Sequence, residues 1–360
     1  MATTKKYIKK TKNQNIPIVV DYRKRDEKFE SINAAIDYFA RRPRRNLPLM
    51  LGNCRFIEDG NNVKIEMGDD RYNFSSKGLE DLLGNLNVPE SFIQYICPKN
   101  YVIPILNNLL EKKKKTKILC WIDETNQALE AITPPKALPI YHHAFLESYS
   151  QAFPEKDSLL EIRLIGYSLH LRRLSTFKEE PVPGDYFQFG IEFSNCDIYS
   201  PNSYPQVIAF LYRLICKNGS TIRSMLKNYS DAFRPPITLV EVRDRMRKIT
   251  LDSTEVGLAI NAIHWMAARQ IGAHRKNIYN FIHRRLKNHL PMAEENPYSE
   301  TSTYFHIFND VTQMIQHPQV PGSVRCALES WAGSLIDAHI DSQVRHAPYV
   351  RWEDRLIPLN

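Results

Sequence analysis

The sequence predicts an α+β protein, in which an antiparallel β-sheet core with packed helices is followed by a helical C-terminal region. One observation is strict alternation of apolar and polar residues after Gly184, which is typical of a half-buried strand. A second is the segment from Val207 to Lys217, which has apolar residues at both odd and even positions, as a central strand buried on both faces does. A third is a change to helical spacing after Pro235-Pro236. The alternating residues that we expect to be buried are Phe187, Phe189, Ile191 and Phe193.

The elements before Gly184 follow from the same periodicities. Helices are expected at residues 32–39, 75–86, 103–113 and 141–153. Strands are expected as a meander over 55–74, then at 117–122, 129–132 and 159–174. The apolar parity of the last strand changes at Gly166, which therefore marks a bulge or a tight turn. We expect one antiparallel sheet, formed by residues 47–74, 117–132 and 159–217, with helices on one face.

The domain organisation is predicted from changes in composition along the chain. Residues 1–15 are polar and rich in Lys, and are expected to be a disordered basic arm. Residues 16–235 form the expected α+β core, 236–341 the helical region and 342–360 a tail. Five helices are expected in the helical region, at 238–249, 253–271, 274–290, 302–316 and 322–341.

The net charge of +8 is concentrated near the N-terminus. Residues 1–45 hold 13 Lys and Arg but only 5 Asp and Glu, whereas the other 315 residues hold 35 of each kind. A basic segment beside a neutral body is a common arrangement in proteins that bind phosphate backbones. The alternative is a solvated tail that aids solubility.

Composition and motifs limit the other function classes. The six cysteines are widely spaced and are expected to be reduced thiols of a cytosolic protein, because no CxxC or Cys/His cluster is present. No apolar run is long enough to span a membrane, and the first residues lack the apolar segment of a secretory signal. The chain has no Walker A, GxGxxG, GxSxG or HExxH motif, so we expect no enzyme activity, no cofactor and no metal.

Acidic residues and a histidine pair leave open the alternative of a metal site. Asp69-Asp70, Asp123-Glu124 and Glu192 with Asp197 could supply the carboxylates of a two-metal nuclease, although acidic pairs in turns are usually solvated. Cross-strand pairing is the simpler explanation for Glu192. His142-His143 are adjacent on a predicted helix and point about 100° apart, which suits two ligands of one ion poorly.

Basic residues near aromatic side chains predict a nucleic-acid interface. Cations follow phosphates while aromatic rings stack on unpaired bases, and Tyr186, Tyr199, Tyr204 and Tyr212 lie near the basic strands. The predicted nucleic-acid contacts are Lys5, Lys6, Lys9, Lys10, Lys12, Arg41, Arg42, Arg44, Arg45, Lys112, Lys113, Lys114, Lys115, Arg163, Arg172, Arg173, Arg213 and Lys217. In the predicted helix at 274–290, Arg285 falls within the apolar stripe, either as a snorkelling side chain or as a phosphate contact.

Several short motifs resemble one family. The pattern GD..Q.GI..SN from Gly184, then YRL.C.NG from Tyr212, resembles phage/plasmid-like proteins that carry domain of unknown function nine-three-two. Further resembling segments are Tyr72–Ser75 with Leu79 to Pro89, Asn107–Leu110, Leu129–Ile140, Phe308–Thr312 and Leu328–Gly333. In the third of these, Pro135-Lys136-Ala137 stands where the family has Arg-Tyr. The resemblance implies a mobile-element protein, and none of its motifs is known as catalytic.

We therefore expect a single-stranded nucleic-acid-binding or DNA-annealing protein of phage or plasmid type. Strands followed by helices suggest a remote similarity to single-strand annealing recombination proteins. The expected partner is single-stranded DNA, without a membrane, in the cytoplasm, and the expected assembly is a homo-oligomer, with a ring as one form. The first alternative is a phage structural or regulatory interaction protein, and the second is a metal-dependent nuclease.

Overall fold

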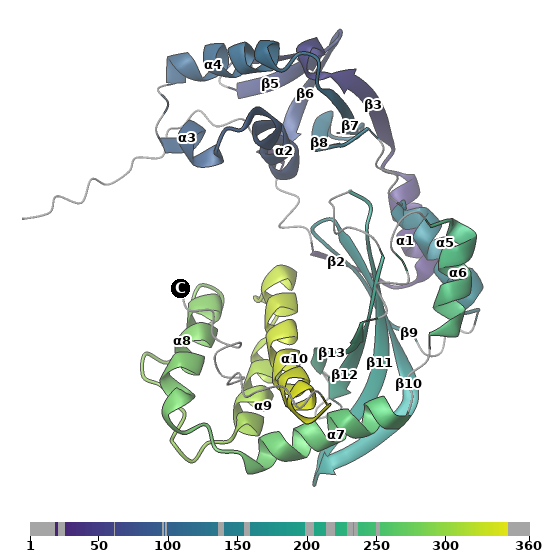
Figure 1. The fold of residues 1–360 in the computed structure, drawn as a ribbon, viewed down its shortest axis with the longest axis vertical. Coiled ribbons are helices and arrows are strands. Elements are labelled where there is room, and N and C mark those ends of the chain that lie inside the picture. The colour runs from purple at the N-terminus through teal and green to yellow at the C-terminus, as the bar shows by residue number, and fades with distance from the viewer. Residues whose placement is uncertain are drawn as a thin grey trace, which may run out of the picture. The chain divides into compact units, whose positions relative to one another are not determined.

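The chain forms two compact units, which are described one at a time (Figure 1). Unit 1 comprises Met1–Arg23, Asp37–Pro139 and Ile198–Asn202, and unit 2 comprises Lys24–Ile36, Ile140–Asp197 and Ser203–Asn360. The computed structural model describes residues 19–20, 26–60, 62–95, 97, 99–135, 140–154, 159–198, 205–213, 220–228, 233, 237–249 and 253–344. Most of unit 1 is thus a continuous insertion in the sequence of unit 2.

Unit 1 is built on a mixed sheet with the strand order β3-β7-β8-β6-β5-β4. Its strands are β1 (Val19–Val20), β3 (Arg44–Met50), β4 (Cys54–Asp59), β5 (Asn62–Met67), β6 (Asp70–Ser75), β7 (Lys117–Asp123) and β8 (Ala128–Thr133). The sheet is mixed because β6 pairs in parallel with both β8 and β1, while the other pairs are antiparallel.

Three helices and a short 3₁₀ turn complete unit 1: α2 (Ser76–Leu86), α3 (Glu90–Tyr95), α4 (Lys99–Lys112) and η2 (Leu51–Asn53). Ser75 caps α2, since its hydroxyl accepts a hydrogen bond from the Gly78 amide and donates one to the Glu130 carbonyl. A Cβ on Gly78 would lie 2.1 Å from the Leu129 carbonyl oxygen, so glycine allows α2 to approach β8 closely. The leucines on one face of α2 are buried: Leu79, Leu82, Leu83 and Leu86.

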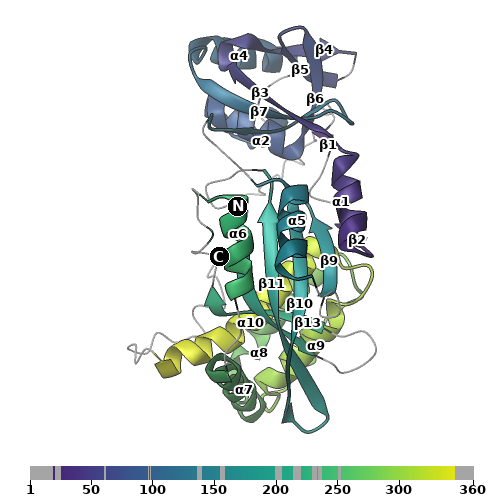
Figure 2. The same ribbon diagram turned by 90° about the vertical axis from the view of Figure 1, so that its right-hand side faces the viewer.

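Unit 2 is built on an antiparallel sheet with the strand order β13-β12-β11-β10-β9-β2. Its strands are β2 (Asp26–Phe29), β9 (Leu159–Ile165), β10 (Ser168–Val182), β11 (Asp185–Cys196), β12 (Gln206–Arg213) and β13 (Ser220–Asn228). Gly166 has φ = 60° in the two-residue turn between β9 and β10, which explains the parity change in the sequence. Figure 2 shows β10 and β11 as a long hairpin that continues past the neighbouring strands.

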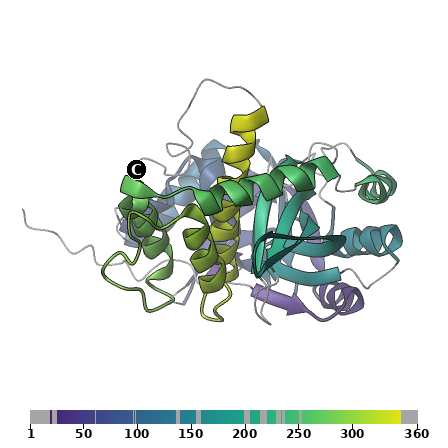
Figure 3. The same ribbon diagram turned by 90° about the horizontal axis from the view of Figure 1, so that it is seen from below.

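Helices lie on both faces of the unit 2 sheet, with α5 and α6 on one face and α9 and α10 on the other (Figures 1 and 3). The helices are α5 (His142–Ala152), α6 (Leu239–Lys248), α7 (Ser253–Ala268), α8 (Arg275–Leu286), α9 (Tyr304–Met314) and α10 (Gly322–Val344), with η4 (Gly272–His274) before α8. A further helix, α1 (Ile32–Ala40), links strands of the two sheets. Phe187 and Phe189 join the apolar core of α7 to α10, whereas Phe193 packs against Tyr149 and Phe153 at α5.

The α+β class and the helical C-terminal region are confirmed. The prediction of one antiparallel sheet with helices on one face was wrong, because there are two sheets and the first is mixed. The boundary that we predicted at Pro235-Pro236 does not separate the two units. The helical region instead packs on the sheet of residues 159–228 and belongs to the same unit. Phe187, Phe189 and Phe193 are buried as expected, and Ile191 is half-buried. Residues 1–15 and 345–360 lie outside the described residues.

Gly190 provides a stability test of the unit 2 sheet. A Cβ at this position would lie 2.3 Å from Cζ of Phe210 and 2.5 Å from the Arg173 carbonyl oxygen. Gly190→Ala should therefore lower the free energy of unfolding by about 1–3 kcal/mol, because the buried ring and backbone must move. Gly257→Ala in α7 is the matched control, as its Cβ meets nothing within 4 Å, and it should not destabilise unit 2. Urea unfolding of both variants checks the difference, and equal midpoints would contradict it.

Candidate nucleic-acid interface

The basic run after α4 forms a tight turn in unit 1, which we call the lysine turn (residues 112–117). The Thr116 amide donates to the Lys113 carbonyl at 2.9 Å and closes the turn. Two further amides, of Leu51 and Gly52 in η2, donate to the Thr116 and Lys114 carbonyls at 3.0 and 3.3 Å. A Cβ on Gly52 would lie 2.5 Å from Cβ of Lys114, so the close contact requires glycine. The backbone of the lysine turn is therefore fixed on the body of unit 1.

The lysine turn presents several ammonium groups without carboxylate partners. Lys112, Lys115 and Lys117 are exposed, and none of them has an ion pair with any residue that the structure describes. Lys113 donates to the Asn85 carbonyl at 2.5 Å, and only Lys114 has a carboxylate partner, Glu111, at 2.5 Å. The predicted contacts Lys112 to Lys115 are thus brought together on one rigid turn, with Lys117 beside them.

The arginines before and within β3 are less available than the lysine turn. Arg44 is half-buried and binds Glu130 through two contacts of 2.6 and 2.8 Å. Arg45 pairs with Asp70 at 3.0 Å, and the guanidinium of Arg42 lies 4.1 Å from the centre of the Tyr38 ring. Arg41 is exposed. In the antiparallel pairing of β3 with β7, these arginines and the lysine turn lie at opposite ends of β3, about 20 Å apart at ~3.3 Å per residue.

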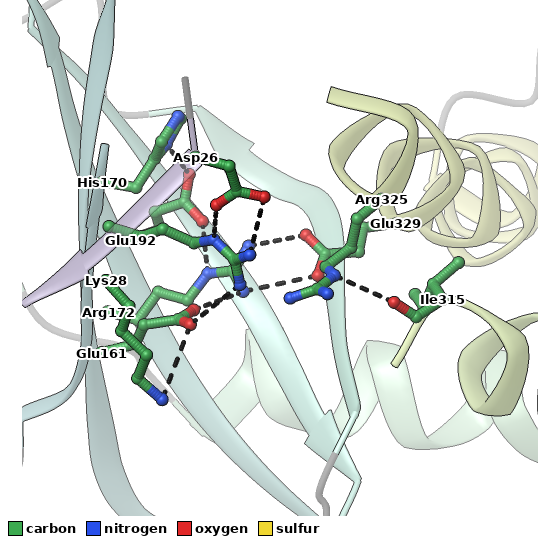
Figure 4. A network of polar contacts seen from close by, with 10 residues as sticks. Asp26, Lys28, Glu161, His170, Arg172, Glu192, Ile315, Arg325 and Glu329 are labelled. Atoms are coloured by element: carbon green, nitrogen blue, oxygen red, sulfur yellow. Dashed lines mark hydrogen bonds and ion pairs between the residues drawn. The ribbon is translucent and has the colours of Figure 1, made fainter. Parts of the chain in front are cut away.

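Two predicted contacts on the strands of unit 2 belong to a buried network of ionic side chains (Figure 4). Arg172 is 4% exposed and lies between three carboxylates. Its Nε is 2.7 Å from Glu192 of β11, and its terminal nitrogens are 2.6 Å from Glu329 of α10 and 3.2 Å from Glu161 of β9. The expectation that Arg172 lines an exposed groove was therefore wrong. Its side chain joins three strands and a helix.

The electrostatics of this site favour a permanently charged guanidinium. Burial alone would lower the pKa of Arg172, but the nearby carboxylates of Glu329, Glu192 and Glu161 raise it well above its usual value. Glu192 and Glu329 are almost fully buried, and the guanidinium of Arg172 supplies counter-charge to both. Glu192 also lies 2.9 Å from Nδ1 of His170, which places the histidine at the edge of the same network.

Arg163 binds a separate carboxylate within the network. Its guanidinium makes two contacts with Asp26 of β2, at 2.5 and 2.8 Å, and is 3.4 Å from Glu161. A Cβ on Gly322 would lie 2.5 Å from Oδ2 of Asp26, so glycine at the start of α10 makes room for this carboxylate. Arg325 of α10 donates to the Ile315 carbonyl at 2.9 Å, and burial followed by the nearby Arg163 lowers its pKa. Arg163 is thus a structural side chain as well.

Of the remaining basic and aromatic residues that we expected to contact nucleic acid, some are described by the structure and others are not. The guanidinium of Arg173 is half-buried and lies 4.3 Å from the centre of the Phe153 ring, so it packs inside unit 2. Tyr186 is exposed and Tyr212 is half-buried. The others lie outside the described residues or side chains: Lys5, Lys6, Lys9, Lys10, Lys12, Tyr199, Tyr204, Arg213 and Lys217.

The acidic and histidine patterns take part in local contacts. Asp123 accepts hydrogen bonds from the Thr125 amide at 2.9 Å and from the Asn126 side chain at 2.7 Å, as a turn-forming carboxylate does. His142 is buried, with Nε2 3.2 Å from Asp197 and Nδ1 3.2 Å from the Asn195 amide nitrogen. Within the described part of the chain, no three His, Cys, Asp or Glu side chains converge as a metal site would require.

The described cysteines are free thiols: Cys54, Cys97, Cys120, Cys196 and Cys326. The first three are buried, and burial raises the pKa of Cys54 to about 11, so this thiol stays protonated near neutral pH. None of the described helices has the length and apolar character needed to cross a membrane.

Comparison with known proteins gives no relative. No family model matches the chain, and neither a curated protein nor a solved structure matches it. The resemblance to the phage/plasmid-like family therefore stays a prediction from the short motifs alone.

The buried network predicts a large cost for removing Arg172. Arg172→Met keeps much of the side-chain volume but removes the guanidinium that both Glu192 and Glu329 bind, so the free energy of unfolding should fall by about 3–5 kcal/mol. The control is Arg245→Met on α6, where the arginine lies only 4.0 Å from Glu241 on a partly exposed surface and the loss should stay below about 1 kcal/mol. Thermal and urea unfolding measure both values. A loss at Arg172 no larger than at Arg245 would contradict a supporting role for the network.

Proposed function

We propose that the protein binds single-stranded nucleic acid without catalysis, through contacts with the phosphate backbone. The observation that carries the proposal is the lysine turn, where Lys112, Lys113, Lys115 and Lys117 lie on a fixed loop without carboxylate partners among the described residues. Polyanion binding releases counterions from the phosphates, and each cation that meets a phosphate adds to the affinity. A fixed turn supports such binding because little backbone freedom is lost when the ligand arrives.

Three other cations of unit 1 differ from the lysine turn in having carboxylate partners. Lys64, Arg71 and Lys77 each have a carboxylate partner, at 2.5, 3.3 and 2.5 Å. These three cations are therefore neutralised within the unit, unlike Lys112, Lys115 and Lys117 of the lysine turn. The basic segment of residues 1–45 adds a charge of +8 in the same chain. Annealing activity, homo-oligomer assembly and a cytoplasmic location are part of the same proposal, and rest on the sequence.

A second candidate function is an interaction protein, favoured by the tip of the β10–β11 hairpin. Phe177 and Tyr186 are 37% and 50% exposed there, and Glu179 and Glu180 are exposed beside them. Exposed aromatic residues next to acidic ones suit a protein partner better than a phosphate backbone. This surface is distinct in its chemistry from the lysine turn.

The proposed function predicts a salt-dependent loss of binding in a lysine-turn variant. Replacing Lys112, Lys115 and Lys117 with Gln should reduce the slope of log affinity against log salt concentration by about 2, at ~0.7 per phosphate contact on a single strand. Fluorescence anisotropy with a labelled single-stranded DNA, repeated at several salt concentrations, measures the slope.

The matched control removes the same number of charges from paired positions of unit 1. Lys64, Arg71 and Lys77 replaced with Gln should leave the slope close to that of the unaltered protein, because these side chains are already neutralised by neighbours. Equal effects of the two sets would indicate a response to net charge alone, and an intact chain without affinity for nucleic acid would exclude the proposed function.

A further inference from the structure

Helix α8 in unit 2 carries basic residues at both of its ends. The helix and its C-cap residue contain Arg275, Lys276, Arg284, Arg285 and Lys287, and no Asp or Glu. Arg275 pairs with Glu300 at 3.2 Å. The other four cations have no ion pair with any residue in the described ranges. Figures 1 and 3 place α8 (green) farther from the sheet than α9 and α10.

The apolar face of α8 is already used by the core of unit 2. Ile278, Ile282 and Leu286 are 5%, 0% and 0% exposed and belong to the large apolar cluster of α7 to α10. A basic amphipathic helix can bind a lipid surface or a partner groove only if its apolar face is free. The face of α8 left for a ligand is therefore polar and cationic.

Three of the exposed cations of α8 lie on one stripe of the helix. Lys276, Asn280, Arg284 and Lys287 are exposed and are spaced by four, four and three residues, which brings them to the same side of the helix. The stripe is about 16 Å long at ~1.5 Å per residue. Arg284 donates to the Asn280 carbonyl at 3.2 Å, so its guanidinium is held along the stripe. An extended row of cations with an amide between them suits a polyphosphate backbone.

The guanidinium of Arg285 is also held in place. It lies 3.8 Å from the centre of the Phe281 ring, and Arg285 itself is exposed. This contact resolves the ambiguity in the sequence, since the arginine reaches the surface across a buried ring. Burial and then the neighbouring Arg284 lower the pKa of Arg285, as expected where like charges lack counter-charges.

The acidic pair that follows α8 in sequence lies next to another side of the helix. After α8 the chain turns back, and the Tyr279 hydroxyl donates to the Ala293 carbonyl, next to Glu294 and Glu295. Tyr279 is about 100° around the helix from Asn280, the centre of the stripe. Glu300 is paired with Arg275, one residue before the stripe begins. The stripe therefore keeps its positive charge.

We propose that the α8 stripe is a second nucleic-acid-binding surface, in unit 2, that holds backbone phosphates of a single strand. This inference rests on the proposed function and extends it to a part of the chain with its own fold. Contacts from both units would add their counterion release, so the intact chain binds with a steeper salt dependence than the lysine turn alone provides.

The test replaces Lys276, Arg284 and Lys287 with Gln in the full chain. Anisotropy titrations with labelled single-stranded DNA should show a log–log salt slope lower by about 2, at ~0.7 per contact. The charge-matched control replaces Lys178, Arg245 and Lys248 of unit 2 with Gln and should keep the original slope. A charge-preserving variant with Lys276→Arg, Arg284→Lys and Lys287→Arg should bind as the unaltered protein does. Circular dichroism and the thermal midpoint confirm the fold of each variant.

The outcomes separate the two proposals. If the intact chain binds DNA and the α8 variant behaves like its control, the α8 inference is overturned while the lysine-turn proposal stands. If the intact chain binds neither single- nor double-stranded DNA or RNA, both are overturned. Binding of polyglutamate in place of nucleic acid, with the same dependence on α8, would overturn the inference in favour of an acidic protein partner. A lower slope in the α8 variant alone supports it.

Discussion

Unit 2 depends on the position of one guanidinium. Arg172 meets Glu161, Glu192 and Glu329, which come from two neighbouring strands and from α10. In the sheet, Arg172 stands directly between Glu161 and Glu192, so the strand register itself creates the row of charges. A buried ion pair need not stabilise a fold more than apolar side chains would, but breaking it is expensive. The row therefore fixes which face of the sheet α10 can occupy and in what register, because any shift would leave a buried carboxylate without its partner.

The presence or absence of a carboxylate partner separates structural cations from those available to a ligand. Arg163, Arg172 and Arg44 are bound by carboxylates inside their units. The lysine turn and α8 are the opposite case, since their backbones are fixed and their cations, apart from Lys114 and Arg275, have no ion pair with the described residues. Arg163 and Arg172 show that a basic residue in a strand is a weak predictor of an exposed cation, because opposite charges on one face of a sheet can neutralise one another across strands.

Much of the fold could be predicted because periodicity is a local property. The cap at Ser75, the turn at Gly166 and the five C-terminal helices are all encoded within a few residues. The division into units could not be predicted, since it depends on strands far apart in sequence, such as β6 beside β8. The burial of Arg172 was missed for the same reason. The pairing of Arg172 with Glu161 and Glu192 could have been inferred from the turn at Gly166 and the alternation of residues along the strands. No nearby residue in the sequence indicated that Glu329 would join them.

The insertion of unit 1 into unit 2 also constrains the order in which the chain can assemble. Strands β3 to β8 come from one continuous stretch, and every residue pair in their ladders is closer in sequence than Arg172 is to Glu329. By contrast, Arg172 and Glu329 are 157 residues apart. Contacts of such high sequence separation form slowly, because a long loop must be closed before they contribute. We therefore expect the sheet of unit 1 to form before the ionic network of unit 2, because that network is complete only when α10 has docked. In a nascent or truncated chain without α10, unit 1 could fold, while Arg172 would have only Glu161 and Glu192 of this network as partners.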